Sequence, residues 1–273
     1  MNSMKCDYSP PLLTLLAVGT LLPLLASPGT AQPAPESQAY LRLTALDPAG
    51  NPVNKLTLDE LTLRLNGDEL QALSIQPIAP TTQIVAIFEG LAVTQRQLNG
   101  AIGQFIGSLD DTSTLDMQSV DGNLDAAIIE AIDDLHARGA QRPVIVLMGQ
   151  PSEMAPSALQ SSQVRGRRRA TDLSGDIDAL GQLLTDHSIL FYGVSITDVE
   201  LPQLQALAAH TGGRFERLPD ATRLNAVVSS IALELSTQHL ISYMPTESTD
   251  TFPNVELARP GLVIRTAPAK LTH

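Results

Sequence analysis

The 273-residue sequence contains one cysteine, Cys6, no tryptophan and only 3% aromatic residues. Cys6 precedes an apolar stretch and does not follow it, as a lipid-attachment cysteine would. Beyond that stretch, the sequence excludes disulfides and thiolate metal sites. The scarcity of aromatic rings also leaves few side chains that could stack on bases or sugars.

Positive charge is scarce as well, with 17 Lys and Arg against 29 Asp and Glu and a formal net charge of −12. This balance argues against nucleic-acid binding, because phosphates require a basic surface. Apolar residues make up 43% of the chain, enough to exclude wholesale disorder. After residue 26, no apolar run approaches the roughly 18 residues of a membrane-spanning helix.

The first 31 residues have the pattern of a secretory signal. A start with one lysine leads into an apolar core at 11–26 that contains Pro23, and Gly29-Thr30-Ala31 then offers small residues for cleavage. We therefore predict a signal peptide over 1–31 and a flexible, proline-rich linker over 32–39. The mature protein is expected to be secreted or periplasmic, with no membrane span.

Residues 40–80 read as an N-terminal β unit of three or four strands. Apolar and polar residues alternate at 40–46 and 61–65, and Asn66-Gly67 is a strong hairpin signal. Thr57 and Glu60 have the spacing of a capping box, which predicts a single helical turn. Strand patterns return at 239–243, 255–257 and 262–265, and we assign 241–273 to a C-terminal β extension.

Between residues 81 and 240, buried strands alternate with amphipathic helices. Continuous apolar runs at 84–88, 144–148 and 189–194 are typical of parallel strands covered on both faces. Helical spacing of apolar residues occurs at 98–109, 124–135, 173–184, 201–210 and 224–235, and Gly212 is a helix stop. The pattern predicts an α/β domain with a doubly wound, mostly parallel sheet, flanked by the N- and C-terminal β units.

These segments, in this order, resemble the bacterial secreted VWFA-related domain family from about Tyr40 to Lys270. The stretch 46–77 resembles the family's leading β unit, and Leu207–Phe215 (LAAHTGGRF) resembles its late helix-to-strand joint. The segments ISYMPT at 241–246 and RPGLVIR at 259–265 resemble its closing strands. The resemblance implies a von Willebrand factor A-like fold.

The metal motif of that family, Asp-x-Ser-x-Ser, is altered in this chain. Its three positions fall on Glu89, Leu91 and Val93. Its second loop, which supplies a Thr in the family, carries Gly122 here, and the Asp of its third loop falls on Gly149. Hard divalent cations need oxygen ligands, which Leu, Val and Gly side chains lack.

The resemblance therefore implies an A-like domain without metal or other cofactor. One alternative stays open, in which Glu89 together with Asp121 retains weak binding of a divalent ion.

Arg165, Arg167, Arg168 and Arg169 form the one basic cluster in this acidic sequence. They could bind a carboxylate or phosphate group of a partner, form a protease-sensitive loop, or belong to an ordinary solvated loop. In the predicted topology they follow a parallel strand, on the side of the sheet where ligands usually bind.

No catalytic motif is present. The sequence has no Gly-x-Ser-x-Gly elbow, no phosphate-binding glycine loop with lysine and no His-Glu-x-x-His. The acidic stretch Asp110, Asp111, Asp116 and Asp121 lacks calcium-loop spacing and is interpreted as solvated turn residues. The histidines have no metal-ligand spacing; they are His136, His187, His210, His239 and His273.

The sequence thus favours an exported, non-catalytic A-like protein that binds another protein or a surface ligand without the usual metal ion. The second hypothesis is a structural accessory subunit of a cell-envelope complex, in which the β units make permanent contacts. A third is a hydrolase whose catalytic residues have no recognisable motif.

Overall fold

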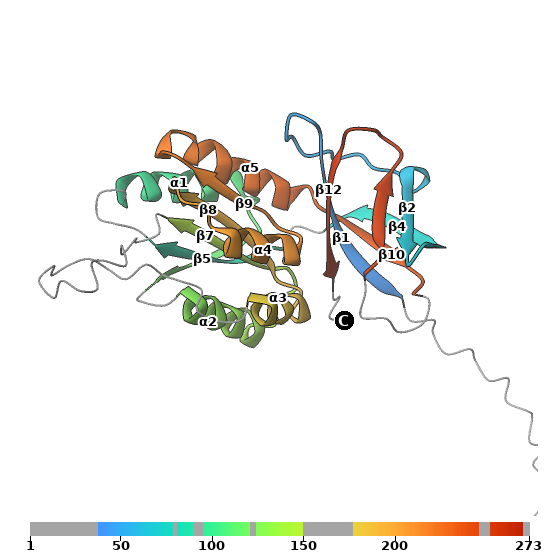
Figure 1. The fold of residues 1–273 in the computed structure, drawn as a ribbon, viewed down its shortest axis with the longest axis horizontal. Helices are drawn as coiled ribbons and strands as arrows, with labels where there is room; N and C mark the ends of the chain where they lie inside the picture. The colour runs from blue at the N-terminus through green and yellow to red at the C-terminus, as the bar shows by residue number, and fades with distance from the viewer. Residues whose placement is uncertain are drawn as a thin grey trace, which may run out of the picture. The chain divides into compact units, whose positions relative to one another are not determined.

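The computed structural model describes residues 38–78, 81–89, 95–120, 124–149, 177–245 and 252–269. They form an α/β protein with one five-stranded parallel sheet and two antiparallel sheets, which confirms the predicted fold class (Figure 1). Within this part of the chain, no helix combines the length and apolarity needed to cross a membrane. The predicted signal peptide lies outside the described residues.

The parallel sheet has the strand order β6-β5-β7-β8-β9. Its strands are β5 (Gln83–Glu89), β6 (Thr114–Ser119), β7 (Pro143–Gly149), β8 (Leu190–Ile196) and β9 (Phe215–Leu218). Every residue of β7 and β8 is buried, which explains why the sequence shows continuous apolar runs there and no alternation.

Helices cover both faces of this sheet (Figure 1). One face carries α1 (Gln95–Ser108) and α5 (Leu224–Ser236), and the other carries α2 (Leu124–Ala137), α3 (Ile177–Asp186) and α4 (Pro202–Thr211). Successive residues of β7 enter opposite cores, since Val146 packs with α1 and α5 while Leu147 packs with α2 and α3. The apolar stripes of the helices complete these two cores.

Strands from both ends of the described chain share the antiparallel sheets. The four-stranded sheet has the order β12-β1-β10-β4, formed by β12 (Val263–Ala269), β1 (Ala39–Leu46), β10 (His239–Tyr243) and β4 (Ala72–Pro77). The three-stranded sheet has the order β11-β2-β3, formed by β11 (Asn254–Leu257), β2 (Leu61–Leu65) and β3 (Asp68–Leu70). A common apolar core that includes Leu41, Leu63 and Ile241 lies between them.

Three local sequence signals are confirmed. A capping box joins Thr57 and Glu60 around the single turn η1 (Leu58–Glu60). Asn66 and Gly67 both adopt positive φ, 53° and 97°, as a tight turn between β2 and β3 requires. Gly212 ends α4 in the left-handed region with φ of 77°.

Two local predictions were wrong. Asp116 lies in strand β6 and not in a turn. Strand β6 has no apolar pattern in the sequence because it is an edge strand with no fully buried residue. Ile106 was placed on the apolar stripe of α1 but is 50% exposed, because Ala101 and Phe105 form the buried face there. The predicted helix start at Leu173 lies outside the described residues.

Candidate functional site

The carboxyl end of the parallel sheet brings together two of the predicted site residues. Glu89, the last residue of β5, is the register partner of Gly149, the last residue of β7. Gly149 in turn pairs with Ser195 of β8. Glu89 and Ser195 are 7% and 3% exposed, so buried oxygen-bearing side chains flank a glycine at the carboxyl end of the sheet.

The other predicted site residues cannot be placed in the same way. Outside the described residues lie Leu91, Val93, Asp121, Gly122, Arg165, Arg167, Arg168 and Arg169. The chain leads into two of their segments from the neighbouring strand ends at Glu89 and Gly149.

Gly149 has a physical reason for being glycine. A Cβ atom at this position would lie 1.8 Å from the backbone oxygen of Glu89 and 2.7 Å from its carbonyl carbon. Any side chain would therefore require the two strands to shift apart at their ends. An aspartate that supplies a metal ligand from this position does not fit the observed backbone.

Among the described residues, no group of three or more His, Cys, Asp or Glu side chains is arranged to hold a metal ion. Glu89 supplies a carboxylate at the carboxyl end of β5. Its register partner Gly149 has no side chain, so this strand pair presents a single carboxylate at its carboxyl end.

A buried ionic cluster, which the sequence analysis missed, lies around Glu234 of α5. Its carboxylate is fully buried, accepts a hydrogen bond from the Tyr192 hydroxyl at 2.8 Å, and forms ion pairs with Arg214 at 3.2 Å and with Arg265. Burial, and next the negative charge of Glu234, raise the pKa of the Tyr192 hydroxyl well above its ordinary value. The cluster joins α5 and the parallel sheet to β12 of the four-stranded sheet.

A second polar contact joins β1 to the amino end of the parallel sheet. The buried guanidinium of Arg42 donates hydrogen bonds to the carbonyl oxygens of Ser188 and Pro268. Burial, and next the nearby charge of Arg142, lower the pKa of Arg42 to about 10. The Gln238 amide completes the contact by donating to the Thr44 hydroxyl at 3.1 Å.

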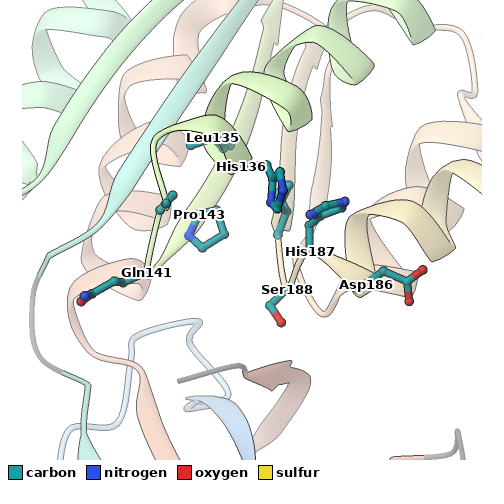
Figure 2. Close-up of a pocket in the computed structure, with 10 residues that line it drawn as sticks. Leu135, His136, Gln141, Pro143, Asp186, His187 and Ser188 are labelled. Atoms are coloured by element: carbon teal, nitrogen blue, oxygen red, sulfur yellow. The ribbon is translucent and has the colours of Figure 1, made fainter. Parts of the chain in front are cut away.

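Next to this contact lies a cavity of about 310 Å³, at the amino ends of β7 and β8. His136, near the end of α2, and His187, directly after α3, line it with their ring centroids 4.7 Å apart and their planes at 71° (Figure 2). The two rings lie close together although the histidines have no metal-ligand spacing in the sequence. Helices α2 and α3 end near each other, and sequence spacing does not reveal that juxtaposition.

Comparison with known proteins gives no family assignment. No protein-family model matches the chain, and no curated protein matches its sequence. Among solved structures, the human COPII-coat protein Sec24c matches with a TM-score of 0.41 and 8% sequence identity. The match covers 72% of this chain, which spans 40% of the length of the Sec24c chain. The fold description therefore depends on the strand order and register given above.

Proposed function

We propose that this protein is an exported, non-catalytic von Willebrand factor A-like protein that binds a protein or surface ligand without the usual divalent ion. The binding site is the carboxyl end of the parallel sheet. The observation that carries the proposal is the pairing of Glu89 with Gly149, because the second position has no room for a ligating side chain.

The A-like assignment is supported by the parallel sheet with helices on both faces and by the segment order in the sequence. In open α/β sheets, ligands bind beyond the carboxyl ends of the strands. Leu91 and Val93 come two and four residues after the end of β5, and their side chains are less polar than the two serines of the family motif.

The arginine cluster at 165–169 follows β7 in the sequence and would supply positive charge for binding the partner. Apolar centres contribute most of the affinity of protein interfaces, whereas charges at the rim mainly set the association rate. An acidic or anionic partner with an apolar patch fits this combination.

The proposal can be tested by capture from the cell-envelope fraction of the native host. Immobilised wild-type protein is compared with the Leu91→Asp variant and with Leu233→Asp, a matched change at a 47% exposed position near the end of α5. We expect Leu91→Asp to abolish capture of the partner that wild type retains, and Leu233→Asp to leave it unchanged. Equal capture by all three proteins would contradict a site at the carboxyl end.

Export is supported by the pattern of residues 1–31. N-terminal sequencing of the protein from its native host should give a chain that begins near Gln32. An intact Met1 on cytoplasmic material would refute export.

A structural accessory role in an envelope complex is the second candidate. Val263 is 51% exposed and begins β12, an edge strand of the four-stranded sheet, and Phe252 ahead of β11 is 47% exposed. Exposed apolar residues at a sheet edge are suited to permanent contacts. This role predicts that Val263→Asp abolishes capture while Leu91→Asp leaves it intact.

A further inference from the structure

The cavity at the amino end of the parallel sheet has the properties of a second binding site, far in sequence from the one proposed above. Its lining includes the imidazoles of His136 and His187 and the hydroxyl of Ser188. Figure 2 shows the two rings side by side, contributed by the ends of different helices. The role of this cavity does not depend on the proposed function.

The separation of the rings matches that of two ligands on one metal ion. With metal–nitrogen bonds of about 2.0–2.1 Å and a bond angle of about 90° to 110°, two imidazoles sharing an ion have centroids about 4.5–5.2 Å apart. The centroids of His136 and His187 are 4.7 Å apart.

The backbone favours a cation at this place. His136 is the penultimate residue of α2, and His187 follows the last residue of α3. The carboxyl ends of helices carry partial negative charge, so two such ends stabilise a positive ion between them. The formal net charge of the chain, −12, acts in the same direction.

The remaining coordination positions fall to water. The Asp186 carboxylate accepts a hydrogen bond from the Gln182 amide at 2.9 Å and points away from the two rings (Figure 2). The Ser188 hydroxyl is in a residue only 6% exposed, and it has no hydrogen-bond partner among the described residues. Figure 2 shows this hydroxyl pointing away from the two rings, so it is not counted among the ligands.

We propose that His136 and His187 together bind one divalent transition-metal ion, of the class of Zn²⁺, Ni²⁺ or Cu²⁺. Imidazole nitrogen suits these ions, whereas Mg²⁺ and Ca²⁺ require oxygen ligands. Two protein ligands and water make a labile site with open positions. Such a site can accept a further ligand from a partner.

The test is calorimetric titration of the full chain without an affinity tag, freed of metal with EDTA, with ZnCl₂ at pH 7.5. We expect one equivalent of Zn²⁺ to bind wild type. His136→Gln and His187→Gln should each weaken binding at least tenfold, and MgCl₂ should not compete. The matched control is His210→Gln, an exposed histidine at the end of α4, which should leave the affinity within twofold of wild type.

Circular dichroism spectra of each variant establish that the fold is kept. Absence of Zn²⁺ binding at millimolar concentration would overturn the proposal. Binding that survives either single substitution with unchanged affinity would also overturn it, since the ion would then not be shared by the two rings.

Discussion

At its carboxyl end, the parallel sheet finishes on Glu89 and Gly149, with a carboxylate and a glycine side by side. At its amino end, two imidazoles line a cavity next to the buried guanidinium of Arg42. In open α/β sheets the first end is where ligands usually bind, and its described residues include one carboxylate, that of Glu89. The second end, usually structural, holds nitrogen ligands and buried charge. The end of a sheet at which ligands usually bind is therefore not always the end that holds the ligating side chains.

The largest expected effect is at the amino end, where Glu234 neutralises two arginines. Glu234→Gln would leave Arg265 without its buried counterion and Arg214 paired only with Glu216, a partly exposed carboxylate 3.0 Å away. Removing one partner of a buried ion pair lowers the free energy of unfolding by about 3 kcal/mol or more. Chemical denaturation followed by circular dichroism should show this loss in the free energy of unfolding. Glu200→Gln, which removes the exposed acid of a surface pair with Arg217, is the control and should cost less than about 1 kcal/mol.

At the carboxyl end, the expected effect is smaller and comes from packing. Gly149→Ala would place a methyl group 1.8 Å from the Glu89 backbone oxygen, so the ends of β5 and β7 must separate. Overpacking of this kind costs about 2 kcal/mol. Gly103→Ala, in α1 with no atom within 4 Å of the new Cβ, is the matched control. It should stabilise the protein by about 0.5–1 kcal/mol, so equal effects of the two changes would contradict the close approach.

Much of the fold could be predicted from the sequence because its signals are local. The continuous apolar run of β7 indicates burial on both faces, and Asn66-Gly67 specifies its turn through backbone conformation. Strand β6 could not be predicted in this way, since an exposed edge strand needs no apolar pattern.

The polar sites also differ in whether local sequence or tertiary contacts determine them. The order of the segments predicts that Gly149 lies at the carboxyl end of the sheet. The need for glycine there comes from the close approach of the Glu89 backbone, which is a tertiary contact. The approach of His136 to His187 depends on where the carboxyl ends of α2 and α3 lie relative to each other. Glu234 did leave a signal, because it stands three residues after Ile231 on the apolar stripe of α5 and so had to be buried with a partner.

A smaller effect should come from pH through His239, the first residue of β10. Burial lowers the pKa of His239 from its ordinary value of 6.5, so the folded protein binds a proton there less readily than the unfolded chain. The contribution of His239 to the free energy of unfolding is therefore fully present above pH 6.5. It falls as the pH drops through that value, because the unfolded chain takes up the proton. Denaturation curves between pH 7.5 and 5 should show this fall, and His239→Gln should reduce its slope. An unchanged slope would contradict the attribution of this pH dependence to His239.

The most direct measurement of the central claim is partner capture by wild-type protein in excess EDTA and in millimolar Mg²⁺ or Ca²⁺ at fixed ionic strength. A carboxyl end that binds its partner without a divalent ion predicts equal capture in all three buffers, with loss on Leu91→Asp in each. Capture that requires Mg²⁺ or Ca²⁺ and disappears on Glu89→Gln would contradict the account, because it would show that the site still holds a hard cation.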